Sequence, residues 1–335
     1  MLFVFLILYC LPYIQKIGIF FIINIWVLIL GYLLPIILII ALMTLLERKL
    51  LGSIQRRQGP NKVGIWGLLQ PIADALKLIF KETLIPGIAN IYLFISSPIL
   101  LFTISLINWV LIPLDYGIVY CDTNLGLLIV NAIASTGVFW IIISGWASNS
   151  KYALLGAVRA GAQMISYEVS LSIVLLILCI FPGTLNITTI IEIQYFCDWF
   201  IFWFLPEFIL FFILALAETN RVPFDLPEAE SELVSGYNVE YSSIMFAFFF
   251  LAEYSSILIM CTLIVIFFLG GFYLFIFSSW VIFFIKFNLI IYLFILIRGT
   301  VPRYRYDQLM NLGWKILLPL ALALYWVNYL LYFFF

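Results

Sequence analysis

Six carboxylic acids lie within one short segment of the chain, residues 218–240, which contains a single base, Arg221. The acids are Glu218, Asp225, Glu228, Glu230, Glu232 and Glu240, and they are interleaved with Pro, Phe, Leu, Val and Tyr. Pro227 suits a first helical turn, which would place Glu228 and Glu232 on one face as a like-charge pair. Like charges in a low-dielectric site raise one another's pKa, so some of these acids can carry protons near neutral pH. A solvated acidic loop is the alternative, although such loops are usually poorer in apolar residues.

Charged residues also interrupt four long apolar runs; they are Glu168, Glu207, Glu253 and Lys286. Charges inside a membrane are costly and usually face a protein interior or water. Together with the acidic segment, Glu168 and Glu253 could form a proton path into the membrane plane. Each carboxylate could instead form a structural ion pair or lie at the end of a helix. This alternative is strongest for Glu207, which lies near the start of its helix beside Pro206. Lys286 could snorkel or neutralise a neighbour, and we favour a pairing role.

The composition excludes several classes of protein. Apolar residues make up 66% of the chain and charged residues 10%, whereas a soluble domain is about half apolar and a quarter charged. A bilayer is therefore the solvent of this chain. The absence of histidine excludes bis-histidine haem and most zinc chemistry. The five cysteines form no C-x-x-C pair, which argues against an iron–sulfur cluster held by this chain alone. The net charge of −1 gives no indication of nucleic-acid binding.

Eight stretches are long and apolar enough to span a membrane, which takes about 20 residues. They lie near residues 19–46, 91–113, 124–148, 162–181, 200–217, 241–269, 273–297 and 312–334. The sequence thus predicts an all-α integral membrane protein with eight transmembrane helices. With no internal repeat evident, we expect one polytopic domain over residues 19–335, preceded by an extension at residues 1–18.

The loops between these stretches differ in charge. All Lys and Arg residues except Lys16 and Lys286 lie in or near four loops, at residues 47–90, 149–161, 218–240 and 298–311. The positive-inside rule places these loops on the cytoplasmic or matrix side. Both chain termini then face the opposite side.

The first of these loops contains an amphipathic helix, expected at about residues 63–82. Its apolar stripe at helical spacing is Ile65, Leu68, Leu69, Ile72, Leu76, Ile79 and Phe80, and its polar stripe is Gln70, Asp74, Lys77 and Lys81. This helix is too charged to span the membrane and is suited to the interface.

A basic cluster from Glu47-Arg48-Lys49 to Arg56-Arg57 and a group of phenylalanines at residues 246–250 each allow two interpretations. The cluster is a topology anchor that contacts lipid phosphates, and it could also form an electropositive mouth for a polar-headed, lipid-tailed molecule. Phe246, Phe248, Phe249 and Phe250 could provide an aromatic wall near Glu253. From the residues alone, ordinary lipid packing is the better interpretation of these rings.

Four segments, in order, resemble the loops of one protein family. They are Glu47-Arg48-Lys49 to Gln70-Pro71-Ile72-Ala73-Asp74, Gly145-Trp146-Ala147-Ser148-Asn149-Ser150-Lys151 to Ser166-Tyr167-Glu168, Ala217-Glu218-Thr219-Asn220-Arg221-Val222-Pro223-Phe224-Asp225 to Glu232, and Pro302-Arg303-Tyr304-Arg305-Tyr306-Asp307. The chain resembles the quinone-site membrane subunits of proton-pumping NADH:ubiquinone oxidoreductase, respiratory complex I, over roughly residues 24–335. Gln58 stands where a base is expected, and about 23 residues precede the usual start of the family.

The resemblance implies a fold of eight tilted spans plus the interfacial helix, in a multi-pass protein of the mitochondrial inner membrane with both termini facing the intermembrane space. It implies that the chain docks the hydrophilic arm and builds the tunnel in which ubiquinone, the substrate, is reduced. NADH, FMN and the iron–sulfur clusters would belong to partner subunits, and this chain would carry no redox centre. Its partners would be the hydrophilic quinone-module subunits, small membrane subunits next to the antiporter-like chain, and lipids.

The resemblance also implies roles for individual residues. The tunnel or entrance residues would be Arg48, Arg57, Asp74, Phe246, Phe249 and Phe250. The acidic proton path would consist of Glu168, Glu218, Asp225, Glu228, Glu230, Glu232, Glu240 and Glu253. Arg303 and Arg305 would face the hydrophilic arm.

Three other functions are compatible with parts of this pattern. A membrane-bound hydrogenase anchor would share the acidic segment. An autonomous secondary transporter would favour internal repeats and helices broken at mid-membrane, which the sequence does not show. A passive structural anchor would not need carboxylates within its spans.

Overall fold

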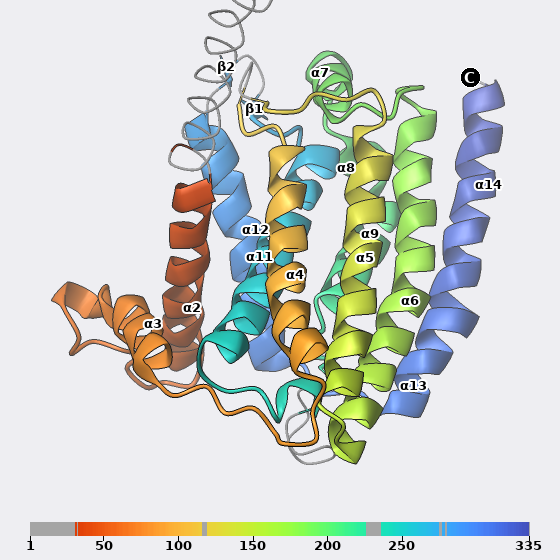
Figure 1. Cartoon of the computed structure of the whole chain (residues 1–335). Coiled ribbons are helices and arrows are strands. Elements are labelled where there is room, and N and C mark those ends of the chain that lie inside the picture. The colour runs from red at the N-terminus through yellow and green to blue at the C-terminus, as the bar shows by residue number, and fades with distance from the viewer. Residues whose placement is uncertain are drawn as a thin grey trace, which may run out of the picture.

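The computed structural model describes residues 31, 33–115, 119–225, 236–274, 277–278 and 280–334 of the chain. These residues form a bundle of long helices that run side by side (Figure 1). The beginning of α2 and the end of α14 lie at one end of the bundle, and α3 and α13 lie at the other (Figure 1). The proposed extension at residues 1–18 lies outside the described residues.

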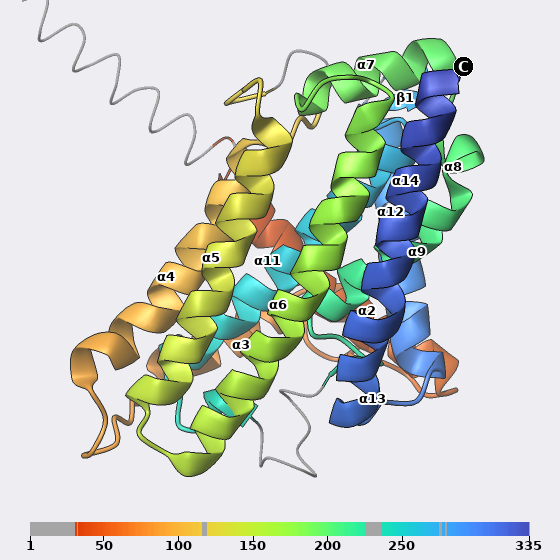
Figure 2. The ribbon, with the colours of Figure 1, turned by 90° about the vertical axis from the view of Figure 1, so that its right-hand side faces the viewer.

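The helices and strands follow one another along the chain as follows. They are α2 (Leu34–Ile54), η2 (Ile65–Gly67), α3 (Gln70–Phe80), α4 (Ile91–Val110), α5 (Gly126–Ala147), α6 (Lys151–Ile180), α7 (Ile187–Cys197), α8 (Phe200–Trp203), α9 (Leu205–Glu218), η3 (Gly236–Asn238), α11 (Ser243–Phe268), β1 (Tyr273–Leu274), β2 (Phe277–Ser278), α12 (Trp280–Thr300), α13 (Tyr306–Asn311), η4 (Leu312–Leu317) and α14 (Leu318–Phe334). The two short strands pair antiparallel, and α7 lies across the ends of the bundle helices (Figure 2).

The chain is an all-α membrane protein apart from this short strand pair. Six helical stretches of the described part are long and apolar enough to cross a bilayer: α4, α5, α6, α11, α12 and the run Tyr306–Phe333. The first predicted span corresponds to α2, which continues eight residues beyond the predicted end at residue 46. Helix α2 can include the charged residues that follow because Glu47 is buried against two arginines.

The predicted span at residues 200–217 is broken in the structure. Helices α8 and α9 meet at Phe204, which has non-helical backbone angles. Pro206 in the first turn of α9 explains the break, because a proline cannot donate a hydrogen bond back to the preceding turn. The single stretch predicted at residues 200–217 is therefore two helices in the structure.

Two other boundaries also differ from the prediction. Helix α6 begins at Lys151, eleven residues before the predicted start at 162, because the Ser150 side chain caps its first turn by accepting from the Ala153 amide. The amphipathic helix is limited to Gln70–Phe80. It is shorter than predicted because Gly64, Trp66 and Gly67 have positive φ angles and form a tight turn before it.

Helix α11 lies at the centre of the bundle (Figure 2). Its residues from Ile257 to Phe268 are all buried. A helix that is apolar on every side is stable only when other helices or lipid surround it. Here α2, α4, α9 and α12 pack around it.

Small residues allow α5 and α6 to approach closely. A Cβ atom on Gly145 would lie 2.3 Å from the Ala157 Cβ, and one on Gly156 would lie 2.9 Å from the Gly236 backbone carbon. Small residues at such crossings let the backbones meet and increase van der Waals contact. The Gly156 contact brings η3, and with it Tyr237, against α6.

Lys286 closes the end of α11. Its ammonium donates to the backbone carbonyls of Leu269, Gly271 and Tyr273, and it lies 4.5 Å from the centre of the Trp199 ring. A cation next to the last carbonyls of a helix is favoured by the helix dipole. The pairing expected for Lys286 is thus made with carbonyl groups and an aromatic ring.

Candidate functional site

Arg221, in the turn after α9, forms a buried ionic cluster with Glu47 of α2 and Glu253 of α11. Its Nη1 atom lies 3.3 Å from the Glu47 carboxylate, and its Nε atom lies 2.7 Å from that of Glu253. The guanidinium also lies 4.5 Å from the centre of the Tyr254 ring. Arg221 is only 6% exposed. Water therefore hardly solvates the two carboxylates, and the arginine charge stabilises them instead.

Glu47 has two further partners in this cluster. The Tyr254 hydroxyl donates to its carboxylate at 2.5 Å, and Arg298 of α12 forms an ion pair with it. Three helices and the turn therefore meet at one carboxylate. A buried carboxylate is tolerated when its oxygens are paired and hydrogen-bonded in this way.

The turn that carries Arg221 is held from two sides. On one side, Gln163 of α6 donates from Nε2 to the Ala217 and Phe224 carbonyls at 3.0 and 2.8 Å. On the other side, Asp225 accepts from Arg303 at 2.9 Å, and Phe224 stacks on Tyr304. Arg303 was expected to face the hydrophilic arm, and in this chain it pairs with one of the proposed path acids.

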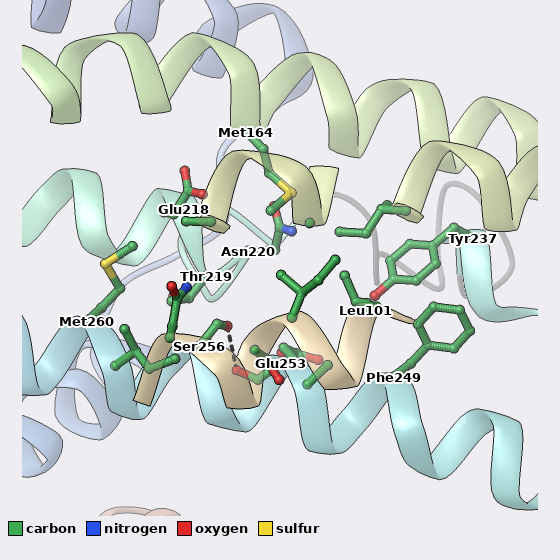
Figure 3. Close-up of a pocket in the computed structure, with 18 residues that line it drawn as sticks. Leu101, Met164, Glu218, Thr219, Asn220, Tyr237, Phe249, Glu253, Ser256 and Met260 are labelled. Atoms are coloured by element: carbon green, nitrogen blue, oxygen red, sulfur yellow. Dashed lines mark hydrogen bonds between the residues drawn. The ribbon is translucent and has the colours of Figure 1, made fainter. Parts of the chain in front are cut away.

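A cavity of about 90 Å³ lies between α4, α5, α6, α11 and the turn (Figure 3). Its polar lining includes Glu218, Asn220 and Glu253, and the rest is mainly apolar. Glu218 and Met260 lie toward one end of the cavity in Figure 3, and Tyr237 and Phe249 lie toward the other. The structure thus brings two of the proposed path carboxylates, from α9 and α11, to one cavity.

Glu168 of α6 lies near this cavity. It is half-buried, within hydrogen-bonding reach of Ser135 on α5, and close enough to Glu218 to interact with it electrostatically. Glu240 is half-buried beyond η3 and is not among the cavity residues. Among the described path acids, Glu218 and Glu253 thus line the cavity, and Glu168 interacts with Glu218.

The proposed quinone residues fall into two groups. Near the end of α2, Arg48 forms an exposed ion pair with Asp74 of α3 at 2.7 Å, and Arg57 is exposed and donates to Gln55. On α11, Phe246 and Phe250 are in contact, with ring centres 4.5 Å apart.

The third phenylalanine of that set, Phe249, has a different environment. It packs edge-on against Tyr237 and Tyr241 and lines the cavity that contains Glu218 and Glu253. Phe249 follows Phe246 by three residues and lies on the same side of α11, where Phe246 packs against the apolar cluster that contains Phe249.

Comparison with known proteins identifies the family. A model described as NADH dehydrogenase matches residues 27–329. The chain belongs to the NADH dehydrogenase family.

The similar proteins agree with this assignment. The chain is 53% identical over 314 residues to NADH-ubiquinone oxidoreductase chain 1 of Chondrus crispus, with 92% of this chain and 95% of that protein covered. It is 54% identical over 296 residues to an NADH-quinone oxidoreductase subunit of Rickettsia typhi, with 86% of this chain and 87% of that protein covered. This member of the NADH dehydrogenase family is thus a membrane subunit of the chain 1 type.

Part of the acidic segment of this NADH dehydrogenase family member lies outside the described residues. Glu228, Glu230 and Glu232 fall within residues 226–235, so their positions relative to the cavity stay predictions. Among the residues that the structure does describe, no group of three Cys, Asp or Glu side chains is arranged to hold a metal ion.

Sequence reasoning missed several residues of the site. Glu47 was assigned to a basic cluster, and neither Arg298 nor Tyr254 was singled out. Only the acidity around Arg221 hinted at its role, because a lone base among six acids must find carboxylate partners. Asn108 of α4 was also missed, since a single amide in an apolar run carries no pattern.

Proposed function

We propose that this chain forms the membrane part of the ubiquinone site of an NADH:ubiquinone oxidoreductase and begins its proton path. In this proposal, ubiquinone enters a tunnel bounded by the end of α2, α3 and the start of α11. An iron–sulfur cluster of the hydrophilic arm would supply the electrons for its reduction. The related proteins of Chondrus crispus and Rickettsia typhi are named as parts of NADH-ubiquinone and NADH-quinone oxidoreductases, which supports ubiquinone as the substrate and other subunits of the complex as partners.

The ionic cluster is the observation that carries the coupling part of the proposal. Glu47 adjoins Arg48, whose ion pair with Asp74 lies at the proposed quinone side. Arg221 links Glu47 to Glu253, which lines the cavity together with Glu218. These ion pairs therefore connect Glu47, the sequence neighbour of Arg48, to the cavity carboxylate Glu253.

The coupling step follows from the shared charge of Arg221. Reduction or movement of the quinone changes the proton occupancy of the acids at residues 218–240. A proton on Glu253 removes its charge and weakens its attraction to Arg221, which then pairs with Glu47 alone. Because ion pairs in a low-dielectric interior are strong, this change biases the proton path through Glu168 and Glu253.

The proposal includes a location. The chain would lie in the mitochondrial inner membrane, with the end of the bundle that carries α3 and α13 facing the matrix. Both termini would face the intermembrane space. The distribution of Lys and Arg over the loops supports this orientation.

The test replaces Glu168 and Glu218 separately by glutamine in the complete complex. Both variants should lose proton-coupled quinone reduction, while NADH oxidation by an artificial electron acceptor, which bypasses the membrane part, stays normal. Glu192→Gln is the matched control, because Glu192 is an exposed carboxylate on α7 at the other end of the bundle. Normal coupled quinone reduction in both variants would refute the proposed path.

A further inference from the structure

Three acceptor oxygens that line the cavity have no hydrogen-bond partner among the residues that the structure describes. They are Asn108 Oδ1, Glu218 Oε2 and Asn220 Oδ1. They come from α4, the end of α9 and the following turn. Asn108 and Glu218 are 4% and 7% exposed, so bulk water does not reach them.

Three hydroxyl groups of the cavity donate elsewhere. Ser105 donates to the Phe102 carbonyl, Thr219 donates to the carbonyls of its own helix, and Ser256 donates to the Glu253 carbonyl (Figure 3). Each hydroxyl has a single proton, which is thus already committed. These three hydroxyl groups therefore do not donate to the unpartnered oxygens.

Buried polar atoms nearly always have a partner, from protein or from ordered water. The molecule that fits here must be small and must donate hydrogen bonds. Water meets both conditions, because a cavity needs roughly 10–15 Å³ to hold one molecule, and this cavity has about 90 Å³. A water molecule in such a site also needs two to four polar partners, which the three oxygens and Glu253 provide.

We propose that Asn108, Glu218 and Asn220 bind a cluster of water molecules, and that Asn108 is a positioning residue for proton transfer between Glu218 and Glu253. This inference rests on the proposed function. In the transfer, the Glu218 carboxylic acid loses its proton to the first water, and the Glu253 carboxylate gains a proton from the last. Each water molecule between them accepts one proton and donates another, so it remains water.

Asn108 is suited to this role because an amide can accept and donate hydrogen bonds but does not take up a proton near neutral pH. It orients the water from α4, opposite the turn that carries Asn220. Asparagine in a membrane helix often serves contact between helices. Among the described residues, the Asn108 oxygen accepts from no protein group, which leaves it free to bind water.

The test compares Asn108→Leu with Asn288→Leu in the complete complex. Asn288 lies on α12 and donates to the Phe284 carbonyl of its own helix, so its replacement makes the same chemical change away from the cavity. Asn108→Leu should slow coupled quinone reduction and alter its solvent deuterium isotope effect. It should also shift the infrared band of protonated cavity carboxyl groups. Asn108→Ser should restore all three, because a hydroxyl can again hold water.

The outcomes separate the inference from the function on which it rests. If Asn108→Leu matches Asn288→Leu in all three measurements while Glu218→Gln loses coupling, the water site is refuted and the proposed path stands. If Glu218→Gln is also normal, the proposed path itself fails. Turnover that depends on Na⁺ at constant ionic strength, and loses this dependence in Asn108→Leu, would assign the cavity to a cation and overturn the inference. Should Asn108→Leu fail to assemble, the smaller Asn108→Val replaces it in the same comparison.

Discussion

The Nε atom of Arg221 lies 2.7 Å from the Glu253 carboxylate in a part of the bundle that water hardly reaches. Arg221 is separated from Glu47, its other carboxylate partner, by 174 residues of sequence. The arginine therefore connects the turn after α9 to α2 and α11 at once. Four predictions test this cluster and the contacts that position it.

Replacing Arg221 by glutamine should prevent normal assembly of the complex. Removing one partner of a buried ion pair costs about 3–5 kcal/mol, because the remaining charge is left uncompensated, and here two carboxylates lose their base. Arg221→Lys should assemble in part, since a lysine keeps the charge but lacks the planar fork that reaches both partners. The amount of complex on native gels measures the effect. Arg56→Gln, at an exposed arginine, serves as the control, and wild-type assembly of Arg221→Gln would contradict the structure.

Replacing Arg48 by glutamine should leave assembly unchanged and raise the KM for quinone. Its ion pair with Asp74 is exposed, and exposed pairs contribute only about 0–1 kcal/mol to stability. An effect on quinone would therefore come from lost contact with the substrate. Steady-state kinetics with a short-chain quinone measures KM, and Lys81→Gln, at an exposed lysine just after α3, is the comparison. An unchanged KM in Arg48→Gln would remove Arg48 from the proposed quinone site.

Replacing Lys286 by methionine should lower the melting temperature of the complex. The ammonium donates to three carbonyls at the end of α11, and a hydrogen bond to a charged group contributes about 1.5–3 kcal/mol. Because methionine also removes the cost of burying a charge, we expect a net loss of about 2 kcal/mol. Thermal unfolding followed by loss of quinone reductase activity measures it. The melting temperature of Lys286→Arg should lie between those of Lys286→Met and the wild type. A methionine variant as stable as the wild type would show that the carbonyls do not need the cation.

Replacing Gly145 by alanine should destabilise the crossing of α5 and α6 by about 1–3 kcal/mol, the usual cost of overpacking. The new Cβ atom would lie 2.3 Å from the Ala157 Cβ, so the helices must separate. Gly137→Ala is the control on the same helix, because its nearest neighbour would be Leu101 Cδ1 at 3.7 Å. Equal amounts of assembled complex in both variants would show that the crossing has more room than the structure describes.

Much of the membrane architecture could be predicted from the sequence. The stretches at residues 91–113, 124–148 and 241–269 correspond to α4, α5 and α11 within three residues at each end. Long apolar runs bounded by charges are sufficient for this, because the bilayer fixes the length of a spanning helix. The predicted helix boundaries were wrong where a buried ion pair allowed charged residues inside a helix, as at Glu47, and where Pro206 interrupted an apolar run.

The candidate site could be predicted only in part. Glu168, Glu218 and Glu253 stand out because carboxylates in apolar runs are rare. Their grouping around one cavity with Asn108 and Asn220 was not predictable, because an asparagine in an apolar run fits lipid contact, helix contact and water binding equally well. Nor does the sequence indicate that Phe249, and not Phe246 or Phe250, lines the cavity.

The sequence by itself determined that this chain is a membrane protein, where most of its long apolar helices lie, and which family it resembles. It determined these because apolar length, loop charge and long motifs are local properties of the chain. The tertiary structure alone decided that Arg221 joins Glu47 to Glu253, and that Tyr254 reaches a carboxylate 207 residues away in sequence. The physical reason is that a helix such as α11, apolar on every side, carries no stripe to specify which face meets which neighbour. Its rotation, and with it every contact of the site, is set by packing against the other helices.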